Sequence, residues 1–371
     1  MQAHTIQGIH HITAIAGDPQ RNLDFYSSVL GLRLVKLTVN FDDPGTYHFY
    51  FGNESGVPGS LLTFFPWPHA PHGTVGSGQV TAIAFAIPTG SASYWRARLS
   101  SRDVEIAHVH ERFGEPVIAI ADRDGLPLEL IETPRARPER AWTGSPIDRE
   151  HAIRGLHSAT VSEEDHVQTA RLLTETMGFA HVGSEGNRYR YCAAGNGPAD
   201  LVDVVSAPGG AVGRPGAGTV HHIAWRTSDD AQQLQWRTEL LRAGCDVTPV
   251  IDRNYFKSIY YREPGGVLFE VATNSPGFAI DEPLGHLGEH LMLPRRYESE
   301  RATLERMLPR VILPSAHGAH GAQTQLRRLT LPELLDAYID ARLSRRVDEM
   351  ARLNREISAR RESREDSEVR P

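Results

Sequence analysis

The sequence predicts an α+β fold in which four βαβββ modules pair into two curved-sheet barrels, followed by a helical C-terminal extension. The order strand, helix and three strands occurs four times, with copies that start near residues 8, 78, 155 and 218. Each copy is too short to bury both faces of its strands, so the copies should pair around shared cavities. The chain has 371 residues, of which 40% are hydrophobic, and this is enough apolar material for such cores.

The first module, residues 5–75, shows the pattern most clearly. An apolar β-rich run at 9–16 is followed by apolar residues at helical spacing, and Gly31 is a suitable helix terminator. Three further strand-like runs follow at 33–39, 47–51 and 60–65, with Gly or Pro between the last two. The apolar positions of the helix are Leu23, Tyr26, Val29 and Leu30.

The other modules repeat this order in residues 76–150, 151–212 and 213–280. Their first strands are expected at 79–87, 155–161 and 219–225. The helix of the second module carries Tyr94 and Leu99, and the helices of the third and fourth end at Gly178 and Gly244. Their last strands are expected at 128–131, 200–205 and 267–271, and an extended C-terminal segment at 281–314.

The remaining residues, 315–371, differ in character from the modules. Small residues and histidines at 315–321 are typical of a linker, and the apolar spacing at 331–360 predicts one or two amphipathic helices. This tail is either a solvated extension or an arm for homo-oligomerisation. His317 and His320 have metal-binding side chains, but their linker context favours a plain connection.

Composition excludes several classes of function. Lys and Arg number 39 and Asp and Glu 46, which gives a net charge of −7 and argues against a nucleic-acid partner. No run approaches the roughly 18 apolar residues of a membrane span. The two cysteines, Cys192 and Cys245, indicate no disulfide framework, so a reducing, cytoplasmic location is expected. The 18 histidines point instead to metal or acid–base chemistry.

Equivalent positions of equivalent strands face equivalent directions, so the modules can be compared residue by residue. In the first strands, His11 of module one matches His222 of module four, whereas modules two and three have Ala82 and Ser158. In the last strands, Glu270 of module four matches residues of modules one and two, namely Thr63 and Glu129. Modules one and four therefore supply two histidines and one glutamate.

Two imidazoles and one carboxylate with open positions are typical of a non-haem Fe(II) site that activates dioxygen, and Mn(II) suits nearly the same ligands. A single histidine on a strand is usually structural, but a buried glutamate is costly unless it is paired or metal-bound. If His11, His222 and Glu270 share an ion, modules one and four must share a cavity, and modules two and three form a metal-free barrel. Glu129 is then a relic of duplication or a salt-bridge partner.

These residues resemble the vicinal oxygen chelate (glyoxalase-like) superfamily, which is built from paired βαβββ modules. Four segments resemble its ring-cleaving dioxygenases that open hydroquinones, and the resemblance covers about residues 5–310. They are Gly8-Ile-His-His-Ile-Thr-Ala-Ile, Asp42-Asp-Pro-Gly-Thr-Tyr-His-Phe-Tyr-Phe-Gly52, Thr63-Phe-Phe-Pro66 and Asp252-Arg-Asn-Tyr-Phe-Lys-Ser-Ile-Tyr260. The resemblance implies Fe(II) held by His11, His222 and Glu270.

The resemblance also implies five residues around the ligands: His10, Thr13, His221, Arg253 and Tyr260. Thr13 lies two residues after His11 and should face the same cavity. Strand alternation alone would turn His10 and His221 away, so their role needs either the resemblance or a local bulge. Arg253 and Tyr260 have an alternative interpretation as a surface arginine and a core tyrosine.

The function implied is insertion of both atoms of O₂ into a hydroquinone-type aromatic diol, with His221 as the candidate proton shuttle. Three alternatives remain open at this stage. A catechol-type extradiol dioxygenase would use similar ligands. A glyoxalase-like metal isomerase would need about four protein ligands, and Thr63 at the fourth position argues against it. A metal-free small-molecule binding protein should lack the His, His, Glu set.

Overall fold

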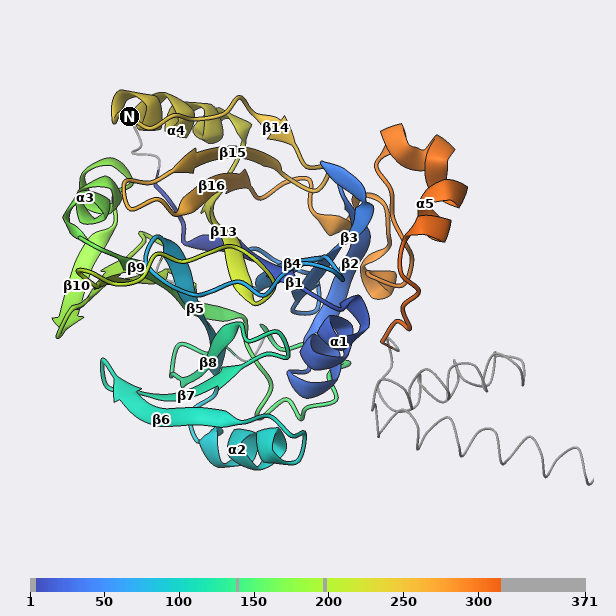
Figure 1. Ribbon diagram of the computed structural model, residues 1–371, viewed down its shortest axis with the longest axis horizontal. Coiled ribbons are helices and arrows are strands. Elements are labelled where there is room, and N and C mark those ends of the chain that lie inside the picture. Colours follow the sequence, from blue (N-terminus) through green and yellow to red (C-terminus); the bar gives the residue numbers. More distant parts are fainter. Residues whose placement is uncertain (1–4, 138–139, 196–198, 315–371) are drawn as a thin grey trace, which may run out of the picture. The chain divides into compact units, whose positions relative to one another are not determined.

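The computed structural model of the protein describes residues 5–137, 140–195 and 199–314. The chain divides into two units, Met1–Leu313 and Pro314–Pro371. The expected linker and helical tail at 315–371, with His317 and His320, lie outside the described residues. The first unit contains the four expected βαβββ modules, which confirms the predicted fold class (Figure 1). The boundaries between the modules stay predictions.

Modules one and four form the first of two eight-stranded sheets, in the order β14-β15-β16-β13-β1-β4-β3-β2. The two modules meet where β1 pairs antiparallel with β13. Module one consists of β1 Ile9–Ala16, α1 Pro19–Asp24, a π-helical turn η1 Phe25–Val29, β2 Arg33–Asn40, β3 Asp43–Gly52 and β4 Leu61–Pro66. Module four consists of β13 Thr219–Thr227, α4 Asp230–Arg242, β14 Ile251–Asp252, β15 Lys257–Arg262 and β16 Leu268–Thr273.

Modules two and three form the second sheet in the same way, in the order β10-β11-β12-β9-β5-β8-β7-β6. Here β5 pairs antiparallel with β9. Module two consists of β5 Gln79–Ile87, α2 Ala92–Ser100, β6 Ile106–Arg112, β7 Glu115–Ala121 and β8 Pro127–Glu132. Module three consists of β9 Leu156–Glu163, α3 Val167–Arg171, a π-helical turn η3 Leu172–Thr176, β10 Ala180–Glu185, β11 Arg188–Cys192 and β12 Leu201–Ser206. The predicted pairing of one with four and two with three is therefore confirmed.

The helix of module one begins earlier than its apolar spacing suggested. Asp18 accepts a hydrogen bond from the backbone nitrogen of Arg21 at 2.8 Å, and Pro19 occupies the first turn. This capping starts the helix before its first apolar residue. The expected terminator Gly31 has a φ of 70°, a conformation in which a side chain would be strained.

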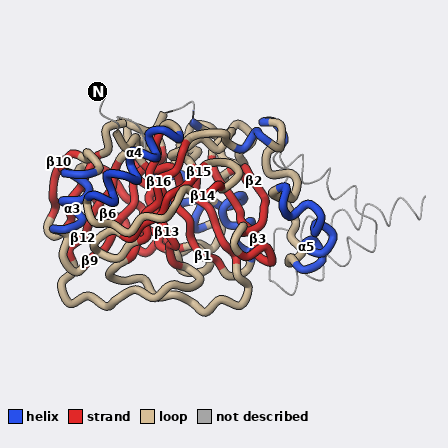
Figure 2. The backbone as a smooth tube through the Cα atoms, turned by 90° about the horizontal axis from the view of Figure 1, so that it is seen from above, coloured by secondary structure: helices blue, strands red, loops and turns tan. Residues whose placement is uncertain are grey.

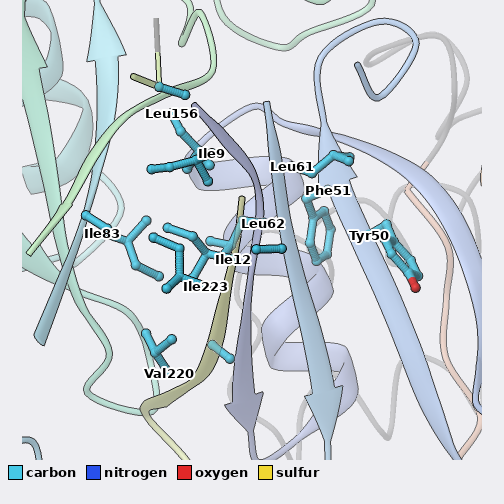
Figure 3. Packing of buried hydrophobic residues seen from close by; sticks show 14 of the residues in the cluster. Ile9, Ile12, Tyr50, Phe51, Leu61, Leu62, Ile83, Leu156, Val220 and Ile223 are labelled. Carbon is cyan, nitrogen blue, oxygen red and sulfur yellow. The ribbon is translucent and has the colours of Figure 1, made fainter. Parts of the chain in front are cut away.

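The two sheets pack against each other through apolar side chains of their central strands. Ile12 of β1 and Ile223 of β13 lie beside Ile83 of β5, and all three are fully buried (Figure 3). Because side chains alternate along a strand, the neighbours of Ile12 face the opposite side of the first sheet. This alternation directs His11 and Thr13 away from the contact between the sheets.

The strands occupy the interior of the unit, and the helices lie around them (Figure 2). After β16 the chain forms short helices over module one, and the buried Lys36 of β2 binds this segment through Asp281 (2.6 Å) and Glu282 (2.5 Å). These helices are η4 Phe278–Ile280, η5 Leu284–His286, η6 Arg295–Glu300 and α5 Arg301–Met307. Among the helices of the described residues, none is long and apolar enough to cross a membrane.

Candidate metal centre

His11, His222 and Glu270 converge although they come from opposite ends of the polypeptide. They extend from β1, β13 and β16, which are neighbours in the first sheet. The Nε2 atoms of the two histidines are 3.2 Å apart, and Glu270 Oε2 lies 3.4 Å from that of His11 and 3.0 Å from that of His222. All three side chains are buried. The predicted meeting of modules one and four at one site is therefore present in the structure.

The two oxygens of Glu270 have different surroundings. The Ser258 hydroxyl donates to Oε1 at 2.5 Å, whereas Oε2 has no well-aligned hydrogen-bond donor among the described residues. Burial alone would raise the pKa of Glu270, but the neighbouring imidazoles of His11 and His222 outweigh it and hold the pKa well below its usual range. The carboxylate is therefore ionised, and its unsatisfied oxygen points at the two imidazoles.

The hydrogen bonds of His10 determine which nitrogen of His11 is free. His10 Nε2 lies 3.1 Å from the backbone oxygen of Thr273, which can only accept, so Nε2 carries the proton. Burial, with a smaller effect of His11, lowers the pKa of His10 to about 3, so the ring is neutral and its Nδ1 accepts. His11 Nδ1 is 2.9 Å away and donates to it. This leaves the Nε2 lone pair of His11 directed at Glu270, as a metal ligand requires.

His221 is the corresponding neighbour of His222. The two Nδ1 atoms are 2.8 Å apart, and the ring of His221 lies beside Phe65 at a centroid distance of 5.6 Å. Both neighbouring histidines reach the ligands through bulges, because His10 and His221 are each the extra residue at a shift in the β1–β13 register. The structure therefore contains the local bulges that were one of the two explanations for how His10 and His221 could reach the ligands.

Three lone-pair atoms this close repel one another unless a cation lies between them. Two imidazole nitrogens and one carboxylate oxygen are the donor set of Fe(II) sites with open positions, and Mn(II) accepts the same donors. The unsatisfied Oε2 of Glu270 and the Nε2 atoms of His11 and His222 that face it fit such an ion. In the described part of the chain, these residues are the one group of three or more metal-binding side chains close enough to share an ion.

Arg253 and Tyr260 lie on the module-four side of the centre. Arg253 Nε donates to the Tyr260 hydroxyl at 3.1 Å, and Arg253 Nη1 binds Asp42 of module one at 2.8 Å. Burial and the charge of Glu270 raise the pKa of Tyr260, so the phenol keeps its proton. The Tyr260 ring is 5.8 Å from that of His222. The two residues bind each other beside a candidate ligand, and their role there stays a prediction.

Thr13 lies on the module-one side, where the sequence analysis missed two further residues. Its hydroxyl is 2.8 Å from that of Thr63, the residue at the position equivalent to Glu270. His48 Nε2 lies 2.9 Å from the Thr63 hydroxyl, and Tyr50 reaches His48 Nδ1 at 3.0 Å. His48 and Tyr50 are two residues apart on the expected strand at 47–51, so they lie on the same face. This shared face was the signal that could have identified them.

Fold and site together define a class of protein, and comparison with known families agrees. Residues 8–130 and 155–271 match the Glyoxalase/Bleomycin resistance protein/Dioxygenase superfamily, and the chain belongs to it. The resemblance to the vicinal oxygen chelate proteins is thereby confirmed.

Two relatives and one solved structure are similar to most of this chain. The chain is 49% identical over 306 residues to the "Putative ring-cleaving dioxygenase MhqO" of Bacillus subtilis (strain 168), covering 82% of this chain and 97% of that one. It is 34% identical over 311 residues to the "Chlorohydroquinone/hydroquinone 1,2-dioxygenase" of Sphingobium indicum, covering 82% and 96%. A crystal structure of a "putative dioxygenase" from Bacillus subtilis superposes with a TM-score of 0.81 at 48% identity, covering 84% and 99%.

Proposed function

We propose that this protein is an Fe(II)-dependent ring-cleaving dioxygenase that inserts both atoms of O₂ into a hydroquinone-type aromatic diol. The convergence of His11, His222 and an ionised Glu270 with an unsatisfied oxygen carries the proposal. The names of its relatives, which include a hydroquinone dioxygenase, support the choice of reaction and substrate class.

His11, His222 and Glu270 would hold the ion. When bound, Fe(II) supplies Lewis acidity that lowers the pKa of a phenol, together with the capacity to exchange electrons with O₂. The chain's own part is to keep these three ligands oriented. Ser258 holds one oxygen of Glu270, and His10 and His221 hold the Nδ1 atoms of the two histidines.

The side chains around the ligands would orient the substrate. A hydroquinone has its hydroxyl groups para to each other, so it cannot chelate one ion through two oxygens as a catechol does. The Tyr260 hydroxyl accepts from Arg253, and its own proton would donate to a substrate oxygen and oppose developing negative charge. Burial and the neighbouring His222 lower the pKa of His221 to about 3, so its neutral ring, bonded to His222, would act as the acceptor of a substrate proton.

Thr63 is the observation against a glyoxalase-like isomerase, which needs about four protein ligands. It stands at the position equivalent to Glu270, and its hydroxyl is already bonded to Thr13 and His48. A catechol-type dioxygenase shares the three ligands and is distinguished by its substrate. The metal-free binding protein is the least consistent alternative, because it leaves Glu270 Oε2 buried without a partner.

The test is anaerobic reconstitution with Fe(II), followed by metal analysis and oxygen uptake with hydroquinone and with catechol. The wild-type protein should bind about one iron per chain and consume O₂ faster with hydroquinone. Glu270→Gln should stay folded, bind little iron and consume no O₂. The matched control is Glu129→Gln in the second sheet, which should keep both its iron and its oxygen uptake. Full activity in Glu270→Gln would end the assignment.

A further inference from the structure

Four side chains of module one form a continuous, buried hydrogen-bond chain beside the candidate metal centre. It runs from Tyr50 to His48, Thr63 and Thr13, with distances of 3.0, 2.9 and 2.8 Å. Each of the four side chains is at most 9% exposed. Such a chain has a direction, because each hydroxyl hydrogen and each imidazole hydrogen can serve one acceptor.

The direction follows from the Tyr50 end. The phenol has His48 Nδ1 as its hydrogen-bond partner among the described residues, and burial keeps the pKa of Tyr50 well above its usual value. A buried phenol with one partner places its proton there, so Tyr50 donates to Nδ1. Burial also holds the pKa of His48 well below its usual value, so the ring is neutral and its single proton is on Nε2.

The remaining steps follow in turn. His48 Nε2 donates to the Thr63 hydroxyl, and Thr63 then donates its own hydrogen to Thr13. The Thr13 hydroxyl accepts this bond and keeps one hydrogen for which the described residues offer no acceptor. Thr13 lies two residues from His11 on the same face of β1, so this remaining donor is on the side of the metal ligands.

We propose that Tyr50, His48 and Thr63 act as positioning residues that orient the Thr13 hydroxyl as a donor to a negatively charged oxygen, a phenolate, bound at the metal centre. The proposal rests on the proposed function and deepens it, because it states the form in which the aromatic substrate is held. Thr63, which occupies the position equivalent to Glu270, thus has a task other than metal binding. The Tyr260 hydroxyl, which accepts from Arg253, would be a second donor from module four.

The experiment uses 4-nitrophenol, whose phenol and phenolate forms absorb at different wavelengths. It is titrated with pH in the presence of the Fe(II)-loaded protein under anaerobic conditions. Thr63→Val interrupts the chain and should raise the apparent pKa of the bound 4-nitrophenol by about one unit, which corresponds to about tenfold weaker phenolate binding. Thr13→Val should have the same effect, and Tyr50→Phe a smaller one, because His48 can then take the other tautomer.

Matched variants separate this role from a structural one. Thr63→Ser keeps the hydroxyl and should restore the wild-type titration. Thr160→Val changes the counterpart of Thr13 in the second sheet, and Tyr47→Phe removes a β3 hydroxyl that bonds to the backbone oxygen of Pro309; both should leave the titration unchanged. Iron content and melting temperature are measured for each variant, so that loss of metal is recognised.

Two results would overturn the inference: wild-type protein that does not bind 4-nitrophenol as the phenolate, or an unchanged apparent pKa in iron-loaded Thr63→Val and Tyr50→Phe. Failure of the proposed function would give a different result. The iron-loaded wild-type protein would then consume no O₂ with hydroquinone, whatever the titration of 4-nitrophenol shows.

Discussion

The two sheets of this protein share one architecture but carry different side chains at equivalent positions. The first sheet has His11, His222, Thr63 and Glu270 where the second has Ala82, Ser158, Glu129 and Asp203. In the second sheet each carboxylate is bound by an arginine. Arg112 binds both oxygens of Glu129 at 2.6 Å, and Arg190 binds those of Asp203 at 2.7 and 3.0 Å.

A carboxylate buried at this position must be neutralised, but the fold does not dictate the means. Arginine neutralises it in the second sheet, and we propose that a metal ion does so in the first. The bulges, by contrast, occur in both sheets: the β5–β9 register shifts at Thr81 and His157, which are equivalent to His221 and His10. The bulges therefore belong to the pairing of modules, and only the first sheet has a histidine at both of them.

The largest contrast is expected from removing one imidazole. His222→Ala deletes one of three ligands and should lower iron affinity more than a hundredfold, because two donors cannot hold Fe(II) against water. The equivalent change in the second sheet, Ser158→Ala, should leave iron binding unchanged. Metal analysis after anaerobic reconstitution and desalting measures both. Stoichiometric iron in His222→Ala would remove the distinction between the two sheets.

Breaking an ion pair of the second sheet should affect stability instead of metal binding. Arg112→Met leaves Glu129 buried without its partner and should lower the free energy of unfolding by about 3–5 kcal/mol. Chemical denaturation measures this loss, and iron content should not change. The double variant Arg112→Met/Glu129→Leu should recover much of the stability, and a failure to recover would show that the arginine has another task.

A third contrast concerns a carboxylate that one sheet has and the other lacks. Glu163 ends β9, where β1 has Ala16, and neither of its oxygens has a hydrogen-bond partner among the described residues. Burial, together with the charge of Glu263, raises the pKa of Glu163 to about 8. Folding therefore favours the protonated form, so its cost appears above the ordinary pKa of a glutamate and grows as pH rises towards about 8.

Glu163→Gln should remove most of this cost. The variant should match the wild-type protein near pH 4.5 and be more stable by roughly 2 kcal/mol near pH 8, since the amide replaces a carboxyl that must otherwise ionise in a buried site. Thermal unfolding between pH 4.5 and 9 measures the difference. A constant difference across this range would show that Glu163 does not titrate there.

The smallest effect is expected from the histidines in the bulges. His10→Phe keeps an aromatic ring beside Phe256 but removes the acceptor for His11 Nδ1, and it should weaken iron binding about tenfold. His157→Phe, the equivalent change in the second sheet, should leave iron binding unaltered. Titration with Fe(II) under anaerobic conditions compares the two. Equal affinities in His10→Phe and wild type would mean that the bulge serves pairing alone.

Much of the candidate site could be predicted because each ligand stands on a regular strand. Alternation and repeat alignment were sufficient to choose His11, His222 and Glu270, and the need for them to meet predicted which modules pair. The salt-bridge interpretation of Glu129 is also confirmed. Asp203 was missed, although the β9–β12 register places it opposite Thr160, the counterpart of Thr13.

The amino-acid sequence by itself determined the four modules, their strand order and the residue types at equivalent positions, because apolar periodicity and glycine placement are local properties. Tertiary structure alone decided which polar groups became partners. His10 bonds to the backbone of Thr273, 263 residues away, and His48 reaches Thr63 only once β3 lies beside β4. Such partners depend on register and on bulges, and these are settled by the packing of whole strands.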